Sequence, residues 1–182
     1  MLIVFNLDTH NDHRALDPLP AGDVLIHGGD FTCYGRQEHA EDFNAWLGEQ
    51  PHRHKIVVNG NHENNAPWQP HARALLSNAV FLKDEAMHIP RERVEDSQSL
   101  GDEDEDKNNN NEKSNEEVGG EGVLTVFGTD FFWPMKAGHS NPHHESIPTD
   151  TQVLVTHGPA KGYVDGGSGC TALHIKCETL SQ

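Results

Sequence analysis

The residues best suited to chemistry in this chain follow short apolar runs. Residues 56–58 form a β-branched run that is long enough for a buried strand but too short for a helix. Asn59-Gly60-Asn61-His62-Glu63 follows directly and sets amide, imidazole and carboxylate groups side by side. A buried strand that ends in this way places such groups at the carboxyl edge of a sheet, where open α/β folds have their sites.

Other apolar runs end in a similar way. Residues 2–5 precede Asp8-Thr9-His10, residues 24–27 precede Gly28-Gly29-Asp30, and residues 153–156 precede His157. Each group alone has a structural interpretation that is as good as the functional one, since Asp30, for example, suits a turn or a helix cap. Their recurrence after successive strands predicts a metal site at one edge of a sheet.

The remaining elements must hold these strand ends together. Residues 37–47 predict a helix, because Ala40, Phe43, Trp46 and Leu47 fall on one face at helical spacing. Further expected elements are a short helix at 70–76, a strand at 80–82, a hairpin pairing 87–89 with 123–127, and a final helix at 171–180.

Composition narrows the class of protein. A chain of 182 residues suits one domain, and a net charge of −16 opposes nonspecific binding to nucleic acid or an anionic membrane. The three cysteines have no spacing typical of a disulfide framework or a zinc knuckle. No apolar run approaches membrane-spanning length, and residues 1–5 are too short for a secretory signal. We therefore expect a soluble cytoplasmic protein without a membrane partner.

Residues 90–122 differ in composition from the rest. The stretch 95–122 carries 11 acidic and 2 basic side chains and no aromatic residue. It cannot bury enough apolar surface to offset the entropy of ordering, so we expect a disordered acidic and asparagine-rich insertion within the single domain. A calcium site is not expected there, because the acidic run lacks a glycine-centred loop with alternating ligands.

Taken in order, the motifs resemble those of the calcineurin-like metallophosphoesterase superfamily. Its pattern is D-x-H, G-D, G-N-H-[DE] and a later histidine, matched here by Asp8-Thr9-His10, Gly29-Asp30, Gly60-Asn61-His62-Glu63 and Thr156-His157-Gly158. The phrases HGGDFT and KIVVNGNHE are similar to the small metallophosphoesterase-domain-containing branch. The resemblance covers nearly the whole chain apart from the acidic insertion.

The resemblance implies an α/β sandwich of two mixed β-sheets flanked by helices, and a dinuclear site. Asp8 and His10 would ligate one metal, Asn61 and His157 the other, and Asp30 would bridge them. Mixed nitrogen and oxygen ligands suit manganese, iron or zinc. A metal-bound hydroxide would then hydrolyse a phosphodiester or phosphomonoester whose identity the motifs leave open.

The resemblance also implies two catalytic residues besides the ligands. His62 would stabilise the transition state and protonate the leaving oxygen, and Glu63 would orient His62 by a hydrogen bond. Oligomeric state and physiological substrate are not indicated by any motif.

One family motif, G-H-x-H, does not occur in the sequence, which ends at Gln182. We therefore expect the last strands of the fold to be missing, the chain to be truncated at its C-terminus, and metal binding to be weakened. A non-catalytic scaffold or regulator is the alternative function. A third interpretation, a metallo-β-lactamase-type zinc motif at His10-Asn11-Asp12-His13, has Asp8 where that motif needs its first histidine.

Overall fold

The computed structural model describes residues 1–91, 122–130, 141–163, 165–167 and 169–180. The first half of the chain forms a four-stranded sheet in which neighbouring strands are parallel and the order is β1-β2-β3-β4. Its strands are β1 (Ile3–Asn6), β2 (Val24–His27), β3 (His54–Val57) and β4 (Val80–Phe81). Parallel pairing brings the carboxyl ends of these strands to one edge.

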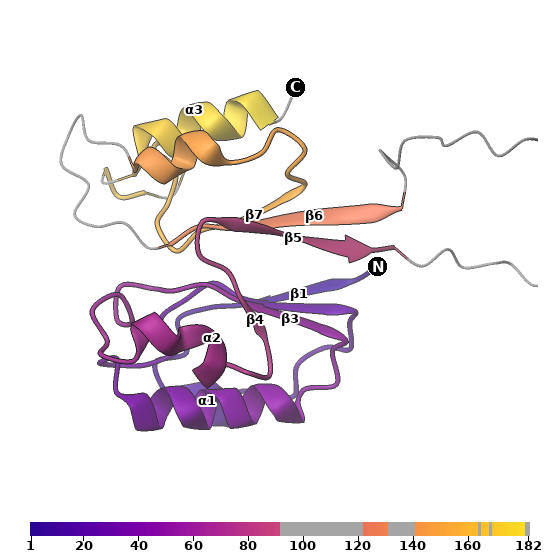
Figure 1. Ribbon diagram of the computed structural model, residues 1–182, viewed down its shortest axis with the longest axis vertical. Coiled ribbons are helices and arrows are strands. Elements are labelled where there is room, and N and C mark those ends of the chain that lie inside the picture. Colours follow the sequence, from indigo (N-terminus) through magenta and orange to yellow (C-terminus); the bar gives the residue numbers. More distant parts are fainter. Residues whose placement is uncertain (92–121, 131–140, 164, 168, 181–182) are drawn as a thin grey trace, which may run out of the picture.

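A second sheet of three strands faces the first (Figure 1). It contains β5 (Glu85–Pro90), β6 (Val123–Gly128) and β7 (Val153–Val155). The pairing of β5 with β6 is antiparallel, as the predicted hairpin requires, and β7 adds parallel to β6. The parallel β7 therefore ends at the same edge as β6, and His157 follows it.

Helices cover the outer faces of both sheets (Figure 1). On the first sheet lie α1 (Gln37–Glu49) and α2 (Ala72–Leu75), and on the second lies α3 (Thr171–Leu180). Short 3-10 turns occur at η1 (Asp12–Ala15), η2 (Gln69–His71) and η3 (Pro142–Ser146). Within the described residues, none of the helices combines the length and the apolar character that crossing a membrane requires.

Alternation of side chains along the strands divides the core into layers. Leu25 and Val57 pack with the buried face of α1, whereas Ile26 and Ile56 face the second sheet. The layer between the sheets is completed by Ile89, Leu124, Val126 and Val155. The strands that pack in this layer lead directly into the polar loops, so the packed core fixes where these loops begin.

The predicted sandwich of two sheets flanked by helices is confirmed, with two differences. The first sheet is parallel and not mixed among the described strands. β3 begins at His54 and not at Ile56, because His54 and Lys55 pair with Val24 and Leu25 despite their polarity. The expected disordered insertion falls largely on 92–121, outside the described residues.

Candidate metal centre

Loops that leave β1, β2, β3 and β7 bring the predicted ligands together. The loops after β1 and β2 remain hydrogen-bonded beyond the strands, since the backbone N–H groups of Asp8, His10 and Asn11 donate to the carbonyls of Gly29, Asp30 and Phe31. This continued ladder fixes the position of Asp8 and His10 relative to Asp30.

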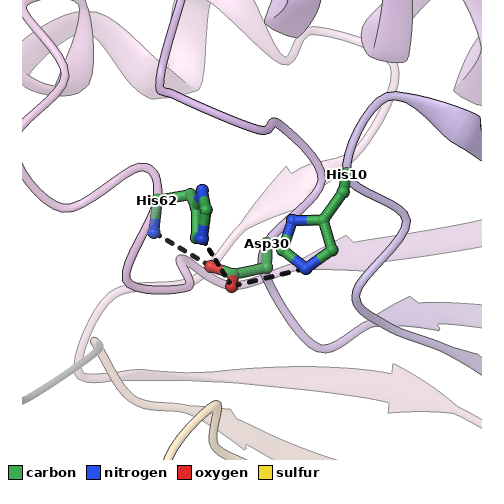
Figure 2. A group of neighbouring side chains, drawn as sticks. All are labelled: His10, Asp30 and His62. Carbon is green, nitrogen blue, oxygen red and sulfur yellow. Dashed lines mark hydrogen bonds and ion pairs between the residues drawn. The ribbon is translucent and has the colours of Figure 1, made fainter.

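Asp30 is the residue that the other side chains share. The Nε2 atoms of His157, His62 and His10 lie 3.4, 3.7 and 3.9 Å from one oxygen, Asp30 Oδ2. Figure 2 shows the rings of His10 and His62 on either side of this carboxylate. The other oxygen, Oδ1, accepts the backbone N–H of His62 at 2.9 Å. Asp30 is 4 % exposed, so its charge is concentrated in a site with little competing water.

Backbone carbonyls determine which nitrogen of two histidines faces the site. The Nδ1 atom of His157 lies 2.8 Å from the Gly28 carbonyl, and Nδ1 of His62 contacts the Cys33 carbonyl. Because a carbonyl only accepts, both Nδ1 atoms carry a proton. In the neutral rings Nε2 then has the lone pair, which is the state a metal ligand needs.

The donor set fits a cation. Asn61 Oδ1 lies 3.3 Å from His157 Nε2, which itself faces Asp30 Oδ2. With a neutral His157, these are three acceptor atoms facing one another, an arrangement that needs a proton or a metal ion between them. Two ligands about 2.1 Å from one ion at tetrahedral angles stand roughly 3.4 Å apart, close to these separations.

In the absence of an ion, a proton on His157 Nε2 can lie between these acceptor atoms. Burial works to lower the pKa of His157, but its hydrogen bond to Asp30 and its contact with the Gly28 carbonyl outweigh burial and raise it. Burial of Asp30 works to raise its pKa, and the hydrogen bonds from His157 and the His62 backbone lower it below the usual value. The two shifts have opposite signs, as expected for an imidazole and a carboxylate that stabilise each other's charged form.

The structure groups the predicted ligands differently from the family pattern. Asp8, Asp30 and His157 form one group with ligand atoms within 4.8 Å of one another, and His10, Asp30 and His62 form another. Asp8 and His10 thus lie in different groups, and the hydroxyl of the buried Thr9 between them contacts His27. Asp30 belongs to both groups.

Glu63 does not have the partner that was expected for it. Its fully buried carboxylate accepts the backbone N–H groups of Asp30, Thr32 and Gly60 and the Thr32 hydroxyl, at 2.6–2.9 Å. Burial raises the pKa of Glu63 against the lowering effect of these donors. Within the described residues Glu63 makes no hydrogen bond to His62, so that prediction is wrong. Glu63 instead fastens the loop after β2 to the loop after β3.

His27, the last residue of β2, is a further site residue that the motifs did not indicate. The Gly29 N–H donates to its Nδ1 at 3.3 Å, so Nε2 carries the proton and donates to the Thr9 hydroxyl at 3.1 Å. Burial lowers the pKa of His27 to about 3, which keeps the ring neutral. His27 thereby joins the Asp8-Thr9-His10 loop to the Gly29-Asp30 turn.

Backbone strain is concentrated in the same loops. Asp8, His10, Asn11 and Asp30 have positive φ angles of 44–74°, a conformation that costs non-glycine residues about 1–3 kcal/mol each. Gly60 permits the close packing, because a Cβ there would lie 2.0 Å from Asp30 Oδ1. Such strain persists where surrounding contacts fix it, and it is typical of functional sites.

The metallo-β-lactamase interpretation of residues 10–13 is not supported. His13 is 1 % exposed and packs edge-on against Phe43, and its Nε2 lies 3.0 Å from Asp42. It belongs to the interface between η1 and α1 and not to either candidate metal group.

The family profile of calcineurin-like phosphoesterases matches residues 7–176, which include all of these loops. The chain belongs to this family. Curated relatives of the chain include human metallophosphoesterase domain-containing protein 1, 32% identical over 163 residues, and a UPF0046 protein of Caenorhabditis elegans, 34% identical over 180 residues. These alignments cover 84% and 87% of the chain and 48% and 51% of the relatives, so the chain spans about half their length.

Another relative of the chain is named for a different activity. A protein of Emericella nidulans named probable rhamnogalacturonate lyase C is 35% identical over 188 residues. The alignment covers 96% of the chain but 15% of that protein. The similarity is therefore confined to a small part of the relative.

Proposed function

We propose that the chain is a phosphoesterase that uses two divalent cations, manganese, iron or zinc, to hydrolyse a phosphodiester or phosphomonoester. The observation that carries the proposal is the convergence of three imidazoles on the carboxylate of Asp30, with Asn61 and Asp8 beside them. Membership of the calcineurin-like phosphoesterases supports it.

The residues present would share the cations as the structure groups them. Asp8, Asp30 and His157 would hold one cation with Asn61 beside His157, and His10 and Asp30 would hold the other. When bound, the cations would acidify a water molecule and stabilise charge on the phosphoryl oxygens. Asp30 is positioned for a bridging role because its backbone is fixed by Glu63 and by the carbonyl hydrogen bond to His10.

His62 is the candidate general acid. Its Nδ1–H donates to the Cys33 carbonyl, so Nε2 points towards Asp30. In the protonated ring, this Nε2–H would pass to the leaving oxygen. A general acid contributes about 10²–10⁴-fold to a rate.

The proposal is tested by titrating the chelator-treated protein with manganese in a calorimeter and measuring hydrolysis of bis(p-nitrophenyl) phosphate. We expect binding of two ions and metal-dependent turnover. Asp30→Asn should abolish both, because it removes the oxygen charge that the two groups share. Metal binding without turnover on phosphodiesters or phosphomonoesters would favour the scaffold or regulator function, and absence of both in the folded protein would overturn the proposal.

A further inference from the structure

An exposed aromatic ring stands beside the candidate metal centre. Tyr34 is 80 % exposed, and its ring centroid lies 6.3 Å from that of His62. Both residues line a cavity of about 330 Å³, together with Asn61, Asn65 and Pro67. Isolated exposed aromatics are common and need no explanation. This one shares a cavity with two residues of the proposed catalytic centre.

The backbone that carries Tyr34 is held on both sides. On one side, Cys33 accepts a hydrogen bond from His62 and donates its own N–H to Asn11 Oδ1. On the other, Gly35 donates to the Thr32 hydroxyl, and its carbonyl accepts the Trp68 indole N–H at 2.9 Å. A rigid loop therefore presents a solvent-exposed ring. Such a ring loses little conformational entropy when it contacts a ligand.

The cavity adjoins the residue that would protonate the leaving group. In the proposed function, His62 gives its Nε2 proton to the leaving oxygen, so the group attached to that oxygen must lie close to His62. The cavity lined by His62 and Tyr34 is next to this residue and can receive such a group. It adjoins a second cavity of about 390 Å³ through Pro67, which leads over Trp68 towards α2.

From this arrangement we infer that the phosphoesterase selects substrates whose leaving group carries a planar aromatic ring, and that Tyr34 is the residue that selects them. The inference rests on the proposed function. The ring of Tyr34 offers a π-face beside the leaving oxygen, and the cavity falls in the size range of small-ligand sites. An offset or edge-on aromatic pair would form there without any change in the metal ligands.

The experiment measures binding of three phosphonates to the manganese-loaded protein by calorimetry: methylphosphonate, cyclohexylphosphonate and phenylphosphonate. Methylphosphonate probes the metal centre alone. Cyclohexylphosphonate has about the same bulk as phenylphosphonate but has no π-face. We expect phenylphosphonate to bind roughly 3- to 10-fold more tightly than cyclohexylphosphonate. Tyr34→Ala should abolish this preference, and Tyr34→Phe should keep it.

Two controls separate the ring from general effects. Methylphosphonate should bind equally well to all Tyr34 variants, since none of them changes a proposed ligand. Tyr163→Ala removes another exposed aromatic, 58 % exposed, that does not line this cavity, and it should leave the phenyl preference unchanged. Melting temperatures of the variants confirm folding.

The outcomes distinguish the two proposals. If methylphosphonate binds and phosphoesters are hydrolysed, but Tyr34→Ala keeps the phenyl preference or the wild type has none, the inference about Tyr34 is overturned and the proposed function stands. If no phosphonate binds and no ester is hydrolysed by the folded, manganese-treated protein, both fall together.

Discussion

His27 and Glu63 illustrate how single buried residues hold a site that they do not line. Each contacts two loops from different strands: His27 joins Thr9 to Gly29, and Glu63 joins Asp30 and Thr32 to Gly60. Neither is a proposed metal ligand. Substituting either residue should therefore affect the site by displacing Asp8, His10 or Asp30.

The neutral state of His27 predicts a dependence of stability on pH. Its pKa is lowered from 6.5 to about 3 in the folded protein, so the unfolded chain takes up a proton that the folded one does not. The contribution to stability is complete above pH 6.5 and is lost as the pH falls towards 3. By pH 4.5 the loss should be about 2–3 kcal/mol.

Urea denaturation of the chelator-treated protein between pH 7 and pH 4.5 measures this effect. His27→Gln retains a donor and an acceptor but does not titrate, so the free energy of unfolding should fall less steeply with acid. Burial also lowers the pKa of His13 and His144. The free energy of unfolding of the variant should therefore still depend on pH, but less strongly. Equal slopes in both proteins would contradict the assignment.

His62→Gln separates proton donation from metal ligation. If His62 acts as the acid, kcat for bis(p-nitrophenyl) phosphate should fall about 10²-fold or more while manganese affinity changes little. Calorimetry and steady-state kinetics on one preparation measure both. A comparable loss of manganese affinity would instead make His62 a ligand beside His10, with which it shares a candidate group.

At the scale of elements, the strand–loop junctions depend on close backbone packing. Gly60→Ala would place a Cβ 2.0 Å from Asp30 Oδ1 and 2.3 Å from Asp30 N. At Gly158, the described residues beyond its chain neighbours leave the space within 4 Å of a Cβ open. We expect Gly60→Ala to displace Asp30 and lower manganese affinity at least 10-fold. Gly158→Ala is the matched control, since it also adjoins a proposed ligand, His157. Similar affinities in both variants would refute the packing argument.

The sequence predicted the elements better than it predicted the contacts between them. Strand β2 and helix α3 have the predicted bounds, because apolar runs and helical spacing are local signals. The polar His54 and Lys55 join β3 only through pairing with β2, which no local pattern records. The strand ends predicted that the candidate ligands would lie close together. No motif predicted the hydrogen-bond partners of Glu63, because a motif does not say where a buried carboxylate points. For His27, the available signal was a histidine in an apolar strand directly before Gly-Gly-Asp.

At the scale of the whole molecule, the acidic stretch lies between two strands that already pair. The Arg91 N–H donates to the Gly122 carbonyl at 2.6 Å, and Pro90 pairs with Val123. Replacing residues 93–120 by four Gly/Ser residues should therefore keep the sandwich. Loop closure becomes less costly, so the free energy of unfolding in urea should rise by about 1–2 kcal/mol. A decrease would show that the segment packs on the sandwich, contrary to the prediction of disorder.

The left-handed conformations of Asp8, His10, Asn11 and Asp30 have a consequence for how folding responds to cations. An ion that binds the native loops and not the unfolded chain stabilises the whole sandwich by mass action, by about 2.7 kcal/mol at a hundredfold excess over its dissociation constant. Metal binding by the candidate groups would therefore couple the strained turns to the supply of metal around the protein. A cell that withholds such metals would then shift the protein towards local opening and proteolysis at the loops that carry the candidate ligands.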